Sequence, residues 1–562
     1  MEIARREVPA AAKLLGAAGV EPVMARVFAA RGIASTAELD NDLTGLPPWQ
    51  ALKGIDAAAE RIAQAIERGE RLLIVADYDA DGATACAVGM RGLAAMGATV
   101  EFLVPNRFEF GYGLTPEIVT FAAARRPRMI ITVDNGIASV EGVAAAQALG
   151  IDVLITDHHL PGERLPEPAW IVNPNQPGCT FPSKHLAGVG VMFYVLCALR
   201  ALLRERGHFA HRTEPRLADL LDLVALGTIA DVVRLDHANR ILVDQGLRRI
   251  RANRMQPGVR ALLAVAGRSP QRATSYDLGF VAGPRLNAAG RLADMSVGIA
   301  CLMSDDQAAA DRIAAELDGL NRERRDVEAT MQEQALADLE RGVDEDGCTL
   351  CLYRADWHQG VVGIVASRLK DRYHRPVIVF ARAGGAGELR GSGRAIAGFH
   401  LRDALDLIAK RAPGLISRFG GHAYAAGLSL HETALDRFVD EFERVGREWL
   451  SPALLKRTIE TDGALAADEL TLGLARSCAA YVWGQGFPAP AFDAEFTVTA
   501  QRVVGDKHLK VALALGERRF EAILFQQTGP LPVRIRAAYR PEVNHYEGLD
   551  SLQLVIEHWL PV

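Results

Sequence analysis

The sequence predicts an α/β protein with a doubly wound parallel sheet, a second α/β domain joined to it by a long helix, and a C-terminal β-barrel. Three observations predict this arrangement. Short, wholly apolar runs such as 72–76 alternate with helical stretches, as buried parallel strands do. A charged segment, 304–342, has helical periodicity. Beyond residue 455 the sequence changes to short runs in which apolar and polar residues alternate, as in the strands of a β-barrel.

Length and composition indicate a folded protein of several domains. The chain has 562 residues, too many for one hydrophobic core, of which 49% are hydrophobic and 23% charged. The formal net charge of −6 argues against coating of nucleic acid by the whole surface, although a local basic groove stays compatible with it. The 7 cysteines are scattered, so we expect a reducing, cytoplasmic location. Cys348 and Cys351 form a single C-x-x-C motif. Because no second cysteine pair or nearby histidine accompanies it, the motif favours a buried strand over a zinc site.

The first half of the chain alternates strands and helices after a helical lead-in of 50 residues. The segment 55–68 carries its apolar residues on one helical face. Thr115 can cap a further helix with Pro116 at its first position. The longest apolar run, 186–199, is too short to cross a bilayer and is predicted to be a buried helix; no signal peptide is visible. The predicted strands are 72–76, 99–104, 129–133 and 153–156, with a helix over 83–96.

The second half contains the connecting helix and two further domains. In the α/β unit we expect a strand over 348–353, a helix over 361–373, a strand over 376–380 and a glycine-rich loop over 384–393. The barrel strands include 494–498, 510–514 and 552–556. The predicted domains are therefore 1–50, 51–303, 304–342, 343–450 and 455–562.

Acidic and imidazole side chains follow three of the predicted strands. They are Asp77, Asp79 and Asp81 after the first, Asp134 after the third, and Asp157, His158 and His159 after the fourth. Ligand sites of open parallel sheets lie outside the carboxyl ends of the strands, so these groups should converge. Several carboxylates at one place repel each other unless a cation neutralises them. Oxygen ligands with one or two imidazoles suit Mn²⁺ or Mg²⁺, so the sequence predicts a metal site.

A later aspartate completes the predicted set. Asp231 ends the apolar run 223–230 and is the preferred ligand, whereas Asp222 is expected at the start of that element. A single Asp after a strand is usually a turn or helix-capping residue, and Asp77 can have that role. Three acidic clusters after three strands of one sheet favour a metal site over three independent turns.

These motifs also carry a resemblance. The triplet Asp157-His158-His159, with the segment 77–82 upstream, resembles the DHH phosphoesterase superfamily and, within it, the RecJ family of single-strand-specific 5′→3′ DNA exonucleases. The resemblance runs along nearly the whole chain. Its supporting stretches are 105–108, 111–114, 186–190, 283–291, 357–363, 391–394 and 419–422. Three positions depart from the family pattern, namely Phe110, Arg234 and Ala395, and none is a proposed metal ligand.

The resemblance implies a DHH catalytic domain, a DHH-associated domain and an OB-fold. It implies two divalent cations, Mn²⁺ or Mg²⁺, held between two lobes, and hydrolysis of phosphodiester bonds that releases 5′-mononucleotides in DNA repair and recombination. Single-stranded DNA is the implied substrate. A single-strand-binding protein and a RecQ-type helicase are the implied partners, and we expect a monomer without a membrane segment. The implied metal ligands are Asp79, Asp81, Asp134, His158 and Asp231, with Asp77 and His159 as further ligands or their neighbours.

We assign roles to these groups as hypotheses. Asp134 is the candidate bridging ligand, and His158 or His159 could donate to the charge that develops in the reaction. Guanidinium groups match phosphate with paired donors, and Ser392 with the amides around Gly391 and Gly393 could form an anion nest. By resemblance this group is a pocket for the terminal 5′ phosphate. The predicted substrate-binding residues are Arg107, Arg285, Asn287, Ser392, Arg394 and His422.

Some alternatives stay open from the sequence. Arg291 could bind phosphate or pair with a local carboxylate, and Trp357 is more often a core residue. Phe108 and Tyr112 could stack on bases or simply pack. The barrel residues Arg502, Lys507, His508, Lys510 and Tyr546 could bind a single strand or form only a solvated face.

Two other functions compete with single-strand exonuclease activity. A DHH phosphoesterase for small substrates would need neither the long helix nor the barrel. A non-catalytic replication scaffold would be expected to have lost metal ligands, and here the acidic set is complete.

Overall fold

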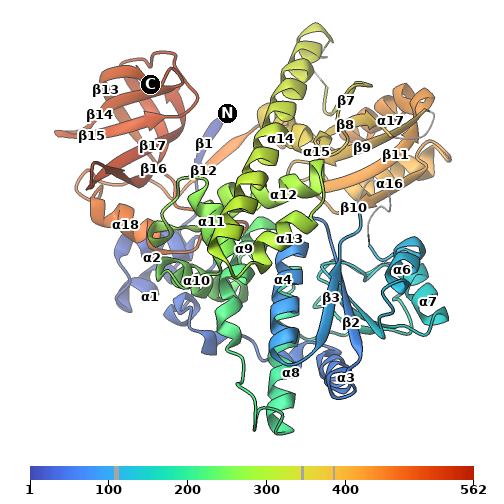
Figure 1. The fold of residues 1–562 in the computed structure, drawn as a ribbon. Helices are drawn as coiled ribbons and strands as arrows, with labels where there is room; N and C mark the ends of the chain where they lie inside the picture. Colours follow the sequence, from blue (N-terminus) through green and yellow to red (C-terminus); the bar gives the residue numbers. More distant parts are fainter. Residues whose placement is uncertain (107–112, 343–346, 384–386) are drawn as a thin grey trace. The chain divides into compact units, whose positions relative to one another are not determined.

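The structure is a computed structural model that describes residues 1–562 apart from 107–112, 343–346 and 384–386 (Figure 1). The described chain divides into two compact units. One unit comprises 1–4 and 321–459, and the other comprises 5–320 and 460–562. The parallel sheet and the C-terminal barrel therefore belong to one unit. The domain boundaries predicted from the sequence stay a prediction.

The larger unit is built on a five-stranded parallel sheet. Its strands are β2 (Arg71–Ala76), β3 (Thr99–Leu103), β4 (Met129–Val133), β5 (Asp152–Thr156) and β6 (Trp170–Val172). They lie in the order β3-β2-β4-β5-β6 with every neighbour parallel. The chain leaves β2 for one edge and returns past it to β4, so the strand order reverses between β2 and β4. This is the doubly wound fold that the sequence predicted, and its ligand crevice is expected at that reversal.

Side chains of β2 alternate between two apolar layers. Leu73 and Val75 pack in a cluster with residues of the helices α6 (Pro116–Ala123) and α7 (Val140–Ala148). Leu72 and Ile74 pack in the main core, which the helices on the other face share. A strand buried on both faces is wholly apolar, which is why this run was recognisable in the sequence. The helices of the main core include α3 (Ile55–Glu67), α4 (Ala80–Ala95) and α8 (Gly188–Glu205).

Further helices follow the sheet in the same unit. They are α9 (Leu221–Ala230), α10 (His237–Arg251), α11 (Pro257–Ala264), a π-helical segment (Asp277–Ala282), α12 (Gly283–Leu292) and α13 (Ser296–Met303). The predicted helical lead-in is only partly helical. It contains α1 (Ala11–Ala17) and α2 (Pro22–Ala29), but it starts with a strand, β1 (Glu2–Arg5), that pairs with β12 (Thr458–Thr461).

A closed β-barrel forms the C-terminal part, as predicted. Its strands are β13 (Phe492–Val504), β14 (His508–Leu515), β15 (Arg518–Leu524), β16 (Arg534–Tyr546) and β17 (Leu549–Pro561), preceded by the helix α18 (Leu472–Ala480). Ion pairs to two buried carboxylates join the barrel region to the N-terminal segment. Arg31 donates to both carboxylate oxygens of Asp462, and Arg5 does the same to Asp493. Phe28 lies within an aromatic cluster with Tyr481.

The helix α14 (Gln307–Gly342) is one continuous element that starts in the larger unit and ends in the smaller (Figure 1). The smaller unit has a mixed sheet in the order β10-β11-β9-β8-β7, in which only β7 and β8 run parallel. Among the helices that the structure describes, none is long and apolar enough to cross a membrane. The elements of the smaller unit that follow α14 are β7 (Leu350–Tyr353), α15 (Val362–Tyr373), β8 (Val377–Arg382), β9 (Glu388–Arg394), α16 (Leu401–Arg411), β10 (Arg418–Gly421), β11 (Ala425–His431) and α17 (Leu435–Trp449).

One prediction in this unit is wrong. The glycine-rich segment 384–393 was expected to be a loop, but from Glu388 onward it is the strand β9; residues 384–386 lie outside the described chain. Both neighbours of β9 pair with it, so Gly391 and Gly393 have partners on β8 and on β11. Strand pairing on both sides uses the backbone amides of such a segment, which disfavours the anion nest predicted at these glycines.

Candidate active site

Three aspartates extend the parallel ladder by one residue beyond their strands. Asp77 follows β2, Asp134 follows β4 and Asp157 follows β5. Each backbone N–H donates to the carbonyl of the last residue of the next strand, at 3.2, 3.0 and 3.2 Å respectively. The sheet therefore fixes where these three side chains start, at its carboxyl edge and beside the reversal between β2 and β4.

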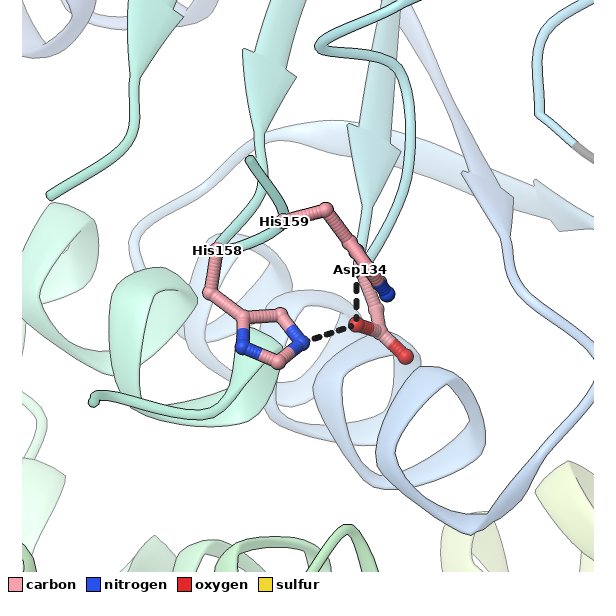
Figure 2. A group of neighbouring side chains, drawn as sticks. All are labelled: Asp134, His158 and His159. Carbon is pink, nitrogen blue, oxygen red and sulfur yellow. Dashed lines mark ion pairs between the residues drawn. The ribbon is translucent and has the colours of Figure 1, made fainter. Parts of the chain in front are cut away.

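Asp134 and the two histidines form the centre of the site (Figure 2). His158 Nε2 lies 3.1 Å from Asp134 Oδ1, and His159 Nδ1 lies 3.9 Å from the same oxygen. Asp134 has a left-handed backbone with φ of 62°. Aspartate tolerates this conformation better than most side chains. Asn135 supports the turn, since its Nδ2 donates to the carbonyls of Val75 and Val133.

Asp81 is held by the start of a helix. Gly188 N and Val189 N, the first amides of α8, donate to its two carboxylate oxygens at 2.6 and 2.9 Å. The positive end of the helix dipole favours a carboxylate there. A Cβ on Gly188 would lie 2.6 Å from Asp134 Cβ, so glycine is required for α8 to approach this closely.

Asp79 and Asp231 reach the site from helix ends. Asp79 is the N-cap of α4, and its Oδ1 accepts from Asp81 N and Gly82 N. Asp231 is the C-cap of α9, and its Oδ2 lies 3.5 Å from His158 Nε2. The structure thus brings together all the predicted metal-site residues. Three groups have potential ligand atoms within 4.8 Å of one another, namely Asp77, Asp79 and Asp134; Asp81, His158 and Asp231; and Asp134, His158 and His159.

Asp157 has a different role from its neighbours in the triplet. Its Oδ1 accepts from the amides of His158 and His159 and lies 2.8 Å from His159 Nδ1. Its Oδ2 accepts from Ile137 N. The carboxylate is therefore used in holding the loop and orienting His159, and it is absent from the three groups. Sequence reasoning did not assign this role; the position of Asp157 directly before two histidines was the available indication.

Burial and mutual repulsion oppose ionisation of the carboxylates. Burial first, and then the charge of Asp231, raises the pKa of Asp81 to about 7. Burial and the charge of Asp79 raise the pKa of Asp231 to about 8, and burial with neighbouring carboxylates raises that of Asp134 well above its ordinary value. These groups fit a hard or borderline cation, since oxygen and imidazole ligands suit Mn²⁺ and Mg²⁺ and a divalent charge offsets the repulsion.

The two histidines are perturbed in opposite directions. Burial lowers the pKa of His158, which favours the neutral ring that a metal ligand needs. Burial also lowers the pKa of His159, but the hydrogen bond to Asp157 and the charge of that carboxylate outweigh it and raise the pKa to about 9. His159 is therefore protonated near neutral pH and can donate to an anion.

We expect the metal-free protein to become less stable as the pH rises from about 5 to about 8. An unfolded aspartate loses its proton near pH ~4, whereas folded Asp81 and Asp231 lose theirs at about 7 and about 8. Between these values the folded state binds more protons, so stability falls with rising pH. Mn²⁺ competes with the same protons, so its stabilising effect should grow over that range. Thermal unfolding with and without Mn²⁺ at both pH values measures this, and an equal effect of Mn²⁺ at both would contradict it.

The predicted substrate-binding residues divide between the two units. Ser392 and Arg394 lie on β9, where Arg394 Nη1 donates to Ser392 Oγ at 3.2 Å and to Gly393 O at 2.7 Å. His422 lies between β10 and β11, and its backbone N–H donates to the carbonyl of Ala425, which is the register partner of Arg394. Arg107, Phe108, Phe110 and Tyr112 lie outside the described residues.

Arg285 and Asn287 are located differently from the expectation. Both were predicted to bind the phosphates of the substrate, Arg285 from a glycine-rich or loop setting, and the structure places both on the helix α12. Arg285 is 9% exposed, donates to Val281 O and pairs with Asp318 at 2.8 Å. Asn287 Oδ1 accepts from Ala80 N at 2.8 Å. Their phosphate-binding roles stay predictions, and the structure shows these polar groups engaged within the protein. Trp357 is buried, as expected.

The fold and the site define a class of protein. A doubly wound sheet with aspartates and a His-His pair at its carboxyl edge is the arrangement of a metal-dependent phosphoesterase. The models of the DHH family N-terminal domain, the DHHA1 domain and the RecJ OB domain match residues 71–228, 346–448 and 461–558. The chain belongs to the RecJ family of the DHH phosphoesterases.

Named relatives cover the whole chain. The single-stranded-DNA-specific exonuclease RecJ of Salmonella typhimurium is 49% identical over 100% of this chain and 99% of its own length. The Escherichia coli protein of the same name is 48% identical with the same coverage. A crystal structure of RecJ from Thermus thermophilus in complex with Mn²⁺ matches with a TM-score of 0.84 and 29% identity. It covers 100% of this chain and 80% of that one.

Proposed function

We propose that the protein is a metal-dependent exonuclease specific for single-stranded DNA, which hydrolyses phosphodiester bonds in the 5′→3′ direction with two Mn²⁺ or Mg²⁺ ions and releases 5′-mononucleotides. The observation that carries the proposal is the convergence of five aspartates and two histidines at the strand reversal of the sheet. Membership in the RecJ family supports the substrate class. The complexes of Thermus thermophilus RecJ with Mn²⁺ and with Mg²⁺ support the choice of metals.

The grouping of ligands supports two neighbouring metal positions. Asp77, Asp79 and Asp134 form one group, and Asp81, His158 and Asp231 form another. Asp134 also approaches His158, so it is the group that can bridge the two positions. When bound, two divalent cations acidify a water molecule and stabilise both the attacking and the leaving oxygen.

The chain's own groups would then position and neutralise the substrate. Asp81 is fixed by the amides of α8, so its carboxylate needs no rearrangement to hold a cation. Protonated His159 can donate to a phosphate oxygen whose charge grows in the reaction. Asp157 keeps that ring oriented and charged.

Arg394 supports a binding site for the terminal 5′ phosphate in the smaller unit. Burial lowers its pKa, and within the described chain its hydrogen bonds go to a hydroxyl and a carbonyl rather than to a carboxylate. A Cβ on Gly363, in the first turn of α15, would lie 3.0 Å from Arg394 Nη2, so this helix N-terminus lies against the guanidinium. A buried cation beside a helix N-terminus favours a phosphate.

Family membership also supports three broader proposals. We propose a role in DNA repair and recombination. We propose partners among single-strand-binding proteins and RecQ-type helicases. We propose a monomer that acts in the cytoplasm.

The function is tested with 5′-phosphorylated single-stranded oligonucleotides, labelled at the 3′ end or at the 5′ end, incubated with Mn²⁺. We expect the 3′-labelled strand to shorten as a ladder and the 5′-labelled strand to release a labelled mononucleotide at once. A matched duplex should resist degradation. Cleavage of small substrates alone, or binding of DNA without cleavage, would contradict the proposal.

A further inference from the structure

The helix α12 packs directly on the loop that carries the acidic ligands. A Cβ on Gly290 would lie 1.9 Å from Tyr78 O, so the backbones of helix and loop touch at that point. Asn287, one turn earlier on the same face, accepts a hydrogen bond from Ala80 N at 2.8 Å. Two residues spaced by three thus hold one short segment, 78–80.

This contact completes the capping of α4. The first amides of a helix lack partners within the helix and need acceptors. Here Asn287 Oδ1 accepts a hydrogen bond from Ala80 N. Asp79 Oδ1 accepts hydrogen bonds from Asp81 N and Gly82 N. Ala83 N then starts the regular pattern by donating to Asp79 O. One oxygen of Asp79 is enough for two amides because Asn287 takes the third, which leaves Asp79 Oδ2 available for a cation.

The rest of α12 is anchored away from the site. Arg285 is joined to Val281 O and to Asp318, which lies on α14. Leu286 and Ala289 are buried in the main core. The helix is therefore a fixed support against which the loop is held, and Asn287 makes a polar contact with the loop.

We propose that Asn287 is a positioning residue for the metal centre, and that it acts through Ala80 and Asp79 rather than by binding the phosphate of the substrate. This inference rests on the proposed metal-dependent function. Loss of the acceptor should let Asp79 rotate to satisfy Ala80 N and so weaken the cation site. Outer partners of metal ligands typically change metal affinity by about 10–100-fold.

The test compares Asn287→Ala with Asn287→Asp. Aspartate has the same shape and retains an acceptor for Ala80 N, but it would repel a phosphate. We expect Asn287→Ala to bind Mn²⁺ about 10–100-fold more weakly, by electron paramagnetic resonance titration without DNA, and to keep its KM for DNA within about 3-fold at saturating Mn²⁺. We expect Asn287→Asp to retain the Mn²⁺ affinity of the wild type within about 3-fold.

The outcomes separate the inference from the function on which it rests. A phosphate-binding role predicts the opposite order, with a raised KM for DNA in Asn287→Ala and a higher one in Asn287→Asp. That result, or an unchanged Mn²⁺ affinity in Asn287→Ala, would overturn the inference while leaving the nuclease intact. A wild-type protein that binds no Mn²⁺ and degrades no DNA would instead overturn the proposed function. Thermal unfolding of each variant excludes loss of the fold as the cause.

Discussion

Asp134→Asn is expected to lower the nuclease rate by about 10³-fold or more. Asp134 is 1% exposed, lies 3.1 Å from His158 and belongs to two of the three potential ligand groups. Asparagine tolerates the left-handed backbone at φ of 62°, so the turn should persist. Neutralising this carboxyl also removes a charge that burial and its neighbours oppose, so the unfolding midpoint without metal should be equal or higher.

The matched control for this variant is Asp506→Asn. Asp506 also has a positive φ, at 56°, but it lies exposed between the barrel strands β13 and β14. It should retain the wild-type rate in the oligonucleotide assay. Substantial activity in Asp134→Asn, measured with Mn²⁺ well above its dissociation constant, would remove Asp134 from the proposed mechanism.

Gly188→Ala is the second change for which we expect a large effect. The added Cβ would lie 2.6 Å from Asp134 Cβ and 2.9 Å from Asp134 Cα, and the Cα is backbone that cannot rotate away. Either α8 must shift away from Asp134, which lengthens the hydrogen bond from Gly188 N to Asp81 Oδ2, or Asp134 itself must move. We expect the nuclease rate to fall by about 10²-fold or more, because a misplacement of about 1 Å at a catalytic site can reduce the rate by that factor. We also expect a loss of about 1–3 kcal/mol in the free energy of unfolding.

Gly190→Ala, one step along the same helix, is the control. Its Cβ would approach the flexible side chain of Leu186 at 3.3 Å and would meet that of Leu242 at 3.8 Å, an ordinary van der Waals contact. Alanine in a helix interior is up to about 1 kcal/mol more favourable than glycine, so this variant should be active and equally or more stable. Chemical denaturation and the oligonucleotide assay measure both effects. Equal behaviour of the two variants would show that α8 does not hold the site in the way described.

The sheet and the barrel could be predicted because local runs of apolar or alternating residues indicate how their strands are buried. The run 129–133 is buried at every position and coincides with β4. The convergence of the acidic groups also followed from sequence, since parallel strands bring their carboxyl ends to one edge. Asp231 was found as the end of an apolar run, and the structure shows that this run is the helix α9.

The remaining parts depend on contacts between distant segments. Asn287 and Arg285 lie among glycines and resemble a phosphate-binding stretch, but helix packing gives their polar groups partners inside the protein. Gly391 suggested a loop, whereas a Cβ there would lie 2.5 Å from the ring of Phe380. The absence of a side chain at Gly391 leaves room for side chains of the neighbouring strands, and the local sequence pattern cannot reveal such a long-range contact.

The ion pairs between the N-terminal segment and the barrel region have a consequence for biosynthesis. Arg31 and Asp462 are 431 residues apart in the chain. At ribosomal speeds of about 5–20 residues per second, α2 would emerge roughly 20–90 s before its partner. Throughout that interval Phe28 lacks Tyr481 and the rings of Trp483 and Phe487 that surround it in the folded protein. The nascent chain therefore presents the apolar side chain of Phe28 without these partners during that interval, and we expect its yield in the cell to depend on chaperones that shield such segments during translation.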